Sequence, residues 1–290
     1  MSQLNAILLH ISAGFLFVAM SALVHEALQQ ANLGQAIFWR SLWSLLVIVM
    51  YARRLGPLRH SLKTNQPFGH VLRGLMGLVA MALHFLCLAH LHISYATSLG
   101  FLAPILVLPL AAVFLAETIT NMVLFVSFLG FSGVLMISFA ELDTGEMPIA
   151  SFIGVAAGLG FALTMAFTRV FVKQLSVKDS AALIALSFSV ITMLGGLATL
   201  PFGWVALGDE AHRNLMFAGL LGGLGHVLSN EAVKHSDISV LGPFDYTAII
   251  WALAIDVMVF GFVPNRLGLF GIFVIAFAAL SLAVKQVRSA

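Results

Sequence analysis

Long apolar stretches follow one another along almost the whole chain, and short polar joints separate them. A transmembrane helix needs about 20 mostly apolar residues. Windows of this kind lie at residues 5–28, 33–52, 70–90, 94–116, 121–140, 148–172, 179–200, 212–234, 238–262 and 267–286. The joints contain Gly, Pro and charged residues, as in the stretch RRLGPLRHSLKTNQP at 53–67. The pattern therefore predicts an all-α polytopic membrane protein with ten transmembrane helices.

The composition supports a membrane protein. Of the 290 residues, 61% are hydrophobic and only 9% are charged, whereas a soluble chain is usually about a quarter charged. So few charges do not cover a soluble surface, and the net charge of +2 gives no reason to expect nucleic-acid binding. The first apolar stretch lacks the basic start and the cleavage site of a signal peptide, so we expect it to be retained as a helix.

The basic residues favour one orientation in the membrane. If both termini are cytoplasmic, the outer joints contain only Arg213 and Arg266 as basic residues. The inner joints and helix ends then contain Arg53, Arg54, Arg59, Lys63, Arg73, Lys173, Lys178, Lys234, Lys285 and Arg288. Cytoplasmic loops of membrane proteins carry an excess of Lys and Arg. We therefore predict a multi-pass protein of the bacterial inner membrane with both termini in the cytoplasm.

The two halves of the chain match each other at a spacing of about 145 residues. The aligned pairs include His90 with His235, Ala103 with Ala248 and, at a spacing of 144, Phe17 with Phe161. The matches are collinear, which indicates two five-helix repeats at 1–140 and 148–290, with 141–147 as a linker. Because five is odd, the second repeat is inverted in the membrane. Inverted repeats are typical of transporters that open a central site alternately to either side.

Two stretches carry a resemblance to a known family. LAPILVLPLAAVFLAET contains Glu117 near its end, and PFDYTAIIWA stands near the start of the ninth window. With the ten predicted helices, they resemble the EamA-type family of the drug/metabolite transporter superfamily, and most closely its amino-acid exporters of the YddG type. The resemblance implies a secondary transporter. At Phe262 the chain departs from the family pattern, which has a second glutamate there, and this speaks against a role that needs a symmetric pair of acids.

Two aspartates in the ninth window are candidates for function, because ionisable residues inside a membrane are costly and usually functional. Asp245 and Asp256 are eleven residues apart, which places them on one face of an unbroken helix. Asp245 is a candidate for substrate binding, and Asp256 a candidate for coupling or gating. Structural pairing with a buried Arg or His, or extension to the membrane interface, is the alternative for both.

Other residues within the apolar windows are candidates for lining a cavity, for close helix packing or for gating. Predicted to line a cavity with Asp245 are Phe17, His84, Phe161, His226 and Asn230. Gly219 and Gly223 share the face of His226 and Asn230, and we expect these glycines to allow close helix packing. Glu117 is a second gating candidate, with capping of the next helix as its alternative. Arg40 is expected to extend to the membrane surface.

Neither a metal site nor a cofactor is predicted. The stretch HFLCLAHLH contains zinc-ligand residue types, but they do not share one helix face. We find no P-loop, GxGxxG or HExxH pattern and no catalytic constellation, so an enzyme is not expected.

The predicted function is export of small metabolites, most of all neutral or aromatic amino acids, through a path between helices 1, 3, 4, 6, 8 and 9. Another metabolite, such as S-adenosylmethionine, riboflavin, a nucleotide-like or a drug-like compound, is the alternative. An intramembrane enzyme or a structural membrane protein is the alternative from a different class. The predicted partners are the small-molecule substrate and the lipid bilayer. Proton coupling and uncoupled facilitation both stay open, as does the oligomeric state.

Overall fold

The computed structural model describes residues 3–55, 64, 66–103, 105–106, 121–142, 148–176, 181–235, 241, 244–245 and 247–289, and within these residues it contains helices and no strand. The helices are α1 (Gln3–Ala27), α2 (Leu33–Leu55), α4 (Pro67–His90), α5 (Ile93–Gly100), α7 (Asn121–Leu142), α8 (Pro148–Ser176), α9 (Ala181–Leu197), the 3-10 helix η1 (Leu200–Phe202), α10 (Asp209–His235), α12 (Thr247–Met258) and α13 (Arg266–Ser289). Helices satisfy their own backbone hydrogen bonds, as a lipid environment requires. The predicted all-α polytopic fold is confirmed.

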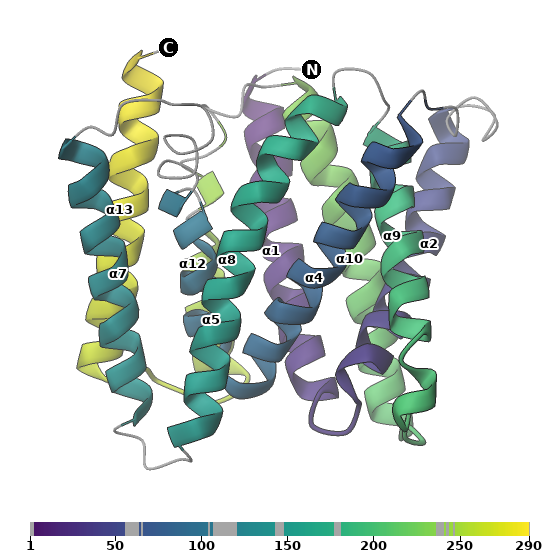
Figure 1. The fold of residues 1–290 in the computed structure, drawn as a ribbon, viewed down its shortest axis with the longest axis horizontal. Coiled ribbons are helices and arrows are strands. Elements are labelled where there is room, and N and C mark those ends of the chain that lie inside the picture. The colour runs from purple at the N-terminus through teal and green to yellow at the C-terminus, as the bar shows by residue number, and fades with distance from the viewer. Residues whose placement is uncertain are drawn as a thin grey trace.

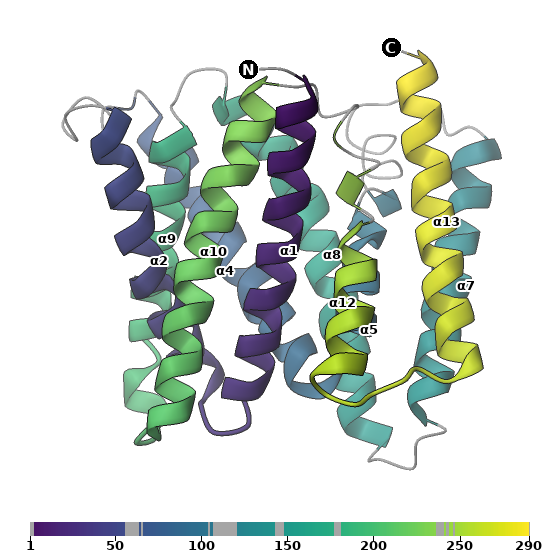
Figure 2. The ribbon, with the colours of Figure 1, turned by 180° about the vertical axis from the view of Figure 1, so that it is seen from behind.

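The helices stand side by side in one bundle (Figure 1). The start of α1 and the end of α13 lie at the same end of this bundle, as both views show (Figures 1 and 2). We call this the terminal end and the opposite one the distal end. Helix α1 runs from the terminal end to the distal end, and α8 runs in the reverse direction.

Each of the ten predicted windows contains a described helix. Among the described residues, five helices are long and apolar enough to cross a membrane by length and composition. In the fourth and ninth windows the described helices are short, α5 with 8 residues and α12 with 12. The count of ten membrane spans therefore stays a prediction.

The contacts between helices follow a regular scheme when the two halves are compared. Helix α1 packs against α10, and α8 packs against α4. In the same way, α2 contacts α10 while α9 contacts α4, and α1 contacts α12 while α8 contacts α5. In each of these pairs, one contact becomes the other when every helix is replaced by the helix at the same ordinal position in the other half. This scheme is the one that the predicted two-fold relation between inverted halves would produce.

Glycines on α10 bring α2 close to it. A Cβ atom at Gly219 would lie 2.6 Å from the backbone oxygen of Arg40, and one at Gly223 would lie 2.9 Å from that of Ser44. Neither backbone atom can move aside without moving α2. The predicted role of these two glycines in close packing is confirmed.

The same kind of contact joins α7 and α13, and it leads to a prediction for Gly133. A Cβ atom at Gly133 would lie 2.8 Å from the backbone oxygen of Gly271. Gly133→Ala is therefore expected to push the two helices apart and to lower the free energy of unfolding by about 1–3 kcal/mol. Unfolding in detergent measures this. Gly14→Ala is the control, because a Cβ atom at Gly14 meets nothing within 4 Å; equal stability of both variants would contradict the prediction.

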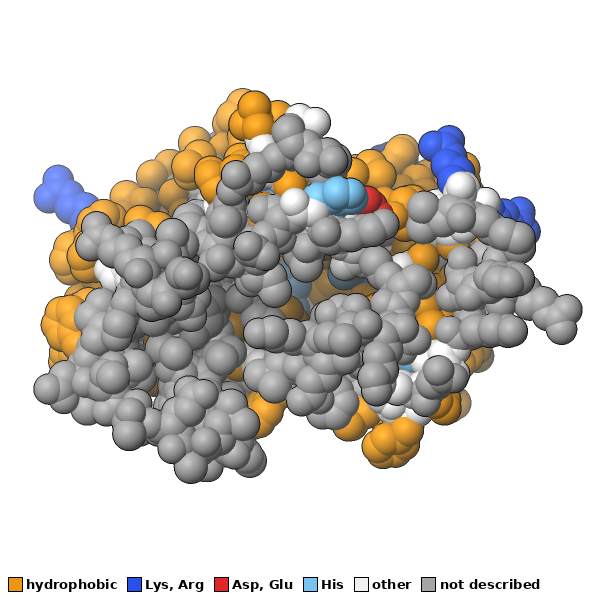
Figure 3. Space-filling view, turned by 90° about the horizontal axis from the view of Figure 1, so that it is seen from above, with side chains coloured by type: hydrophobic (Ala, Val, Ile, Leu, Met, Phe, Trp, Pro, Cys, Tyr) orange, Lys and Arg blue, Asp and Glu red, His pale blue; other side chains and the backbone are white. Residues whose placement is uncertain are grey.

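Large apolar side chains cover the outer surface of the bundle. Phe128, Phe152 and Phe273 are 70%, 72% and 62% exposed. Seen from the terminal end, apolar side chains surround much of the perimeter (Figure 3). Such a continuous apolar surface is expected where lipid tails replace water.

The expectation for Arg40 is wrong. Its side chain does not extend to the membrane surface but is 2% exposed, between α1, α2 and α10. The reason is its orientation: residue 40 points into the bundle, where Met20 and His226 surround the guanidinium group. A long side chain reaches the surface only when its helix face is directed there.

Candidate functional site

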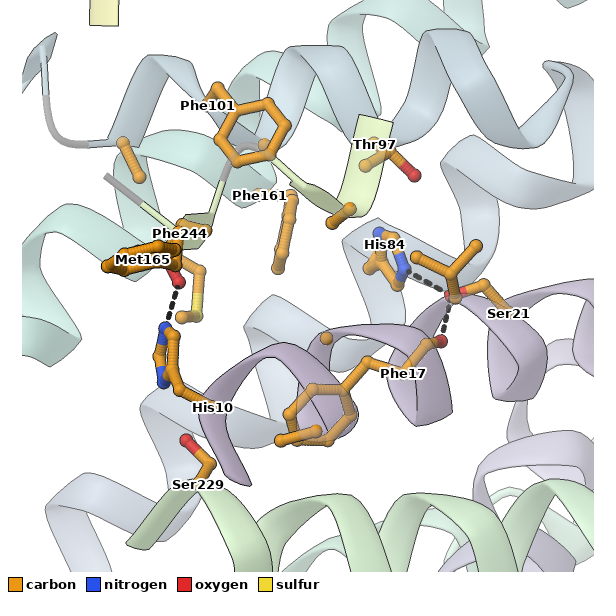
Figure 4. A pocket seen from close by; sticks show the side chains of 17 residues that line it. His10, Phe17, Ser21, His84, Thr97, Phe101, Phe161, Met165, Ser229 and Phe244 are labelled. Atoms are coloured by element: carbon orange, nitrogen blue, oxygen red, sulfur yellow. Dashed lines mark hydrogen bonds and ion pairs between the residues drawn. The ribbon is translucent and has the colours of Figure 1, made fainter. Parts of the chain in front are cut away.

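A pocket of about 220 Å³ lies between the two halves of the chain (Figure 4). Its described lining consists of His10, Ala13, Gly14, Phe17, Val18, Ser21, His84, Thr97, Gly100, Phe101, Ala103, Phe161, Met165, Ser229, Phe244, Asp245 and Ala248. These residues belong to α1, α4, α5, α8, α10, α12 and the segments next to them. In chain order these are helices 1, 3, 4, 6, 8 and 9, which is the set that the sequence predicts for the substrate path.

An acidic residue and a histidine meet at one side of the pocket. The Nε2 atom of His10 lies 2.7 Å from Oδ1 of Asp245, with 14% and 35% of the two side chains exposed. Ser229 is close to His10 (Figure 4). Asp245 precedes α12, which begins at Thr247, so it does not continue the helix face of Asp256 as expected. A partly open carboxylate of this kind can pair with a cation or exchange a proton.

A second polar group lies farther along α1. The hydroxyl of Ser21 donates to the backbone oxygen of Phe17 at 3.0 Å, and its Oγ lies 3.3 Å from Nε2 of His84. Since the hydroxyl hydrogen is used by Phe17, the Ser21 oxygen accepts from an Nε2–H group of His84. This assignment leaves Nδ1 of His84 as an acceptor, and that atom has no hydrogen-bond partner among the described residues. Thr97 lies near this group (Figure 4).

Aromatic and apolar side chains form the walls between the polar groups. The ring of Phe161 lies against His84, with centroids 4.6 Å apart. Phe101 and Phe161 lie above Phe17 in the view of Figure 4, and Phe244 and Met165 also belong to the lining. Apolar walls with a few polar groups are typical of small-molecule sites.

Ten of the 17 described lining residues form pairs at the spacing of the predicted repeat. The pairs are Phe17 and Phe161, Ser21 and Met165, His84 and Ser229, Gly100 and Asp245, and Ala103 and Ala248. Both members of each pair contribute to the pocket, although their side chains differ in three of the five pairs. The pocket therefore lies between parts of the chain that the predicted repeat aligns, and its described lining contains an acidic group in the second half only.

The structure brings most of the predicted cavity residues together. Phe17, His84, Phe161 and Asp245 all line the pocket. His226 and Asn230 are absent from its described lining, where Ser229 represents α10 instead. His226 lies behind Phe17, with ring centroids 5.0 Å apart. The part of each residue in substrate binding stays a prediction.

His10 is a lining residue that the sequence analysis missed. It forms a series with three other lining residues of α1, namely Gly14, Phe17 and Ser21, at spacings of 4, 7 and 11 residues. These spacings place all four on one helix face. The same spacing drew attention to His226 and Asn230 in the eighth window, and it would have found His10.

Asp256 lies outside the described lining of the pocket and is fully buried. Its carboxylate accepts hydrogen bonds from the backbone N–H groups of Ile93, at 3.2 Å, and Ser94, at 2.7 Å. These are the first residues of α5, where helix N–H groups lack partners within the helix and where negative charge is favourable. Asp256 thus caps α5 from a neighbouring helix. A coupling or gating role for Asp256 stays a prediction, and the other gating candidate, Glu117, lies outside the described residues.

Aromatic and imidazole rings lie between the pocket and the distal end. His25, near the end of α1, bonds through Nδ1 to the backbone oxygen of Leu88 at 2.5 Å and lies against Phe260. Phe262, at the position where the family pattern has glutamate, stacks on His92 with centroids 3.4 Å apart. At the terminal end, by contrast, the surface is hollowed in the middle, and histidine side chains are visible in the hollow (Figure 3). Among the described residues, these rings thus lie together on the distal side of the pocket.

Residues 4–139 match the model of the EamA-like transporter family. This match covers the first half of the chain. Over 280 residues, 96% of both chains, the sequence is 25% identical to a pseudopaline exporter of Pseudomonas aeruginosa. It is also 24% identical over 255 residues to an S-adenosylmethionine uptake transporter of Rickettsia bellii, which covers 88% of this chain and 85% of the relative.

A solved crystal structure has the same fold. It superposes with a TM-score of 0.68 at 16% sequence identity and covers 98% of each chain. The EamA-like domain, the apolar helices and the relatives together assign the chain to the membrane transporters of small metabolites. The names of these relatives indicate transport rather than catalysis.

Proposed function

We propose that the chain is a secondary transporter that works by alternating access between two inverted five-helix halves, residues 1–140 and 148–290. The opposite directions of α1 and α8, the matched helix contacts and the paired lining residues support this division. We infer that the pocket opens toward the terminal end and that a layer formed by the rings of His25, Phe260, His92 and Phe262 closes the distal side. Rocking of one half against the other would open that layer and close the terminal end.

The proposed substrates are neutral or aromatic amino acids, moved out of the cell. The observation that carries this choice is the Asp245–His10 pair at the edge of an aromatic pocket. The carboxylate of Asp245 can bind the ammonium group of an amino acid, and the rings of Phe17 and Phe161 can contact its side chain.

Larger amino-acid derivatives such as S-adenosylmethionine are the second candidate. The length of the pocket favours them, because His10 and Ser21 are eleven residues apart on α1, which corresponds to roughly 16 Å. A single amino acid does not span this distance. The uptake transporter of Rickettsia bellii is named for this substrate, whereas the relative from Pseudomonas aeruginosa is named as an exporter, so both directions of transport need to be measured.

Counterflow in proteoliposomes tests the proposal. Vesicles containing the purified protein are loaded with an unlabelled amino acid or S-adenosylmethionine, and entry of the labelled compound is followed with and without a pH gradient. We expect acceleration of entry by internal neutral or aromatic amino acids. Acceleration by S-adenosylmethionine alone would favour the second candidate, and no acceleration by either class would contradict both. An effect of the gradient would identify proton coupling.

A further inference from the structure

Arg40 is held in the middle of the bundle without an acidic partner among the described residues. Its Nε and Nη2 atoms lie 3.4 and 3.3 Å from the sulfur of Met20, and Nη2 lies 3.2 Å from Nε2 of His226. Thioether sulfur is a weak acceptor, and a neutral imidazole offers a single acceptor nitrogen. The third nitrogen, Nη1, is buried and has no hydrogen-bond partner in the part of the chain that the structure describes.

A second arginine lies beside this group. The guanidinium of Arg73 is stacked over the ring of Phe188, with its Cζ 4.8 Å from the ring centroid. The same ring contacts His226, with centroids 5.4 Å apart. Nε and Nη1 of Arg73 are also buried without hydrogen-bond partners among the described residues. Arg40, Arg73, His226 and Phe188 therefore form one contiguous group, which we call the arginine cluster.

The arginine cluster is unusual because its positive charges are not balanced. Burial of a charged group is costly unless a partner of opposite charge compensates it. Within a membrane such groups almost always pair with other groups or mark the path of a substrate. The planar guanidinium group is suited to hold a carboxylate through two parallel hydrogen bonds. Both arginines have N–H groups that make no hydrogen bond to described residues, and an anion is the ligand that would satisfy them.

Phe17 lies between the cluster and the pocket. Phe17 lines the pocket on one side and lies against His226 on the other. Met20, one turn along the same helix, covers the guanidinium of Arg40. Gly222 leaves the space for this contact, since a Cβ atom there would lie 2.6 Å from Nη2 of Arg40. A rotation of Phe17 or a small shift of α1 would join the cluster to the pocket.

We propose that the arginine cluster is an anion subsite that binds a carboxylate group of the transported substrate. This inference rests on the proposed transport function and narrows its substrates to compounds that carry a carboxylate. In the structure Met20 occupies the place of the anion next to Arg40, and Phe17 closes the entrance. Asp245 and His10 are then a cation subsite on the opposite side of Phe17. This subsite is ten residues, or roughly 15 Å, from Met20 along α1, so a single amino acid contacts the two subsites in turn and only a longer substrate spans both.

Binding of three related compounds to the purified protein tests this subsite. L-Phenylalanine carries both charges, 3-phenylpropanoate lacks the ammonium group and phenethylamine lacks the carboxylate. We expect both carboxylates to raise the midpoint of thermal unfolding of the wild type. Arg40→Met should weaken their apparent affinity about ten- to a hundred-fold, as expected for loss of hydrogen bonds to a charged group. Any effect of phenethylamine should be the same in both proteins.

Matched variants separate this role from a structural one. Arg54→Met, at an exposed site near the end of α2, should bind all three compounds as the wild type does. Without ligand, Arg40→Met should unfold at the midpoint of the wild type or above it, because it removes an unbalanced buried charge. Arg40→Lys keeps the charge but loses the planar group, and it should show a smaller loss of affinity.

The proposal is overturned if the carboxylates stabilise Arg40→Met as much as the wild type, if they do not stabilise the wild type, or if unliganded Arg40→Met is clearly less stable. Binding that depends on Arg40, together with an absence of counterflow, would leave the subsite in place and contradict only the transport function. Counterflow that is unchanged in Arg40→Met would leave the transport function in place and contradict only the subsite.

Discussion

Asp245→Asn is expected to lower the rate of substrate counterflow about ten- to a hundred-fold, the loss that corresponds to one hydrogen bond with a charged group. Asp245 is the acidic residue of the described pocket lining, and Asn preserves its size while removing its charge. Asn can still bond to His10, so the local structure should be retained. The initial rate of counterflow, per amount of folded protein in the vesicles, measures the effect.

Glu210→Gln is the matched control for this experiment. Glu210 lies exposed in the first turn of α10 at the distal end, and loss of its charge should leave the rate unchanged. A wild-type rate in Asp245→Asn would contradict the assignment of this carboxylate to the substrate or to a proton. If Asp245 couples proton movement to substrate transport, a pH gradient should no longer accelerate substrate entry in Asp245→Asn. Exchange of substrate across the membrane without a gradient should continue.

The second large effect is expected for Asp256, and it concerns stability. Asp256→Asn replaces one of two accepting oxygens with an NH2 group, which leaves a backbone N–H group of Ile93 or Ser94 without a partner. An unsatisfied buried donor costs about 1–3 kcal/mol in the free energy of unfolding. His92, the residue before α5, makes no side-chain capping bond that would replace the lost one.

Unfolding of Asp256→Asn in detergent measures this effect, and Asp209→Asn is its control. Asp209 is an exposed residue in the first turn of α10, where loss of charge should cost well under the effect at Asp256. Unchanged stability of Asp256→Asn with loss of counterflow would contradict the capping role. That result would instead support coupling or gating, the role that the sequence suggested.

The sequence predicted those features that depend on local pattern or on the repeat. Windows of apolar residues located the helices, and the spacing of 144 residues drew attention to Phe17 and Phe161, which face one pocket. His84 was also predicted from the sequence to line the cavity, and it does line the pocket. Ser229, which the repeat aligns with His84, was missed, and Asn230 was predicted in its place. In a helix that is apolar on most sides, the sequence pattern does not determine which of two adjacent residues faces the pocket.

Features that depend on which helices meet could not be predicted. The bonds of Asp256 join residues 162 and 163 positions apart in the chain, and no pattern within the ninth window reveals them. Arg40 could not be placed either, because an arginine at that depth can extend to the surface or into the bundle, and the packing of α10 decides between the two. Asp245 left the helix face of Asp256 because α12 begins only at Thr247.

The chemical difference between the halves matters for the mechanism. Gly100 and Asp245 are equivalent positions in the two halves, and so are Ser21 and Met165, but only one member of each pair is polar or charged at the pocket. The similar halves can therefore form two related conformations, one open to each side of the membrane, while the substrate contacts the same polar groups in both. This is the arrangement expected for alternating access to a single site.

Access to the pocket from each side of the membrane tests the central claim most directly. The chain has a single cysteine, Cys87, which is buried, so Cys87→Ala combined with Ser229→Cys places one thiol in the pocket. A maleimide that cannot cross the membrane is added to either side of oriented proteoliposomes. We predict that the maleimide reacts with the introduced thiol from both sides of the membrane. A transported substrate should raise the labelling rate from one side and lower it from the other. Reaction from one side only, with and without substrate, in a variant that still shows counterflow would contradict alternating access at this pocket.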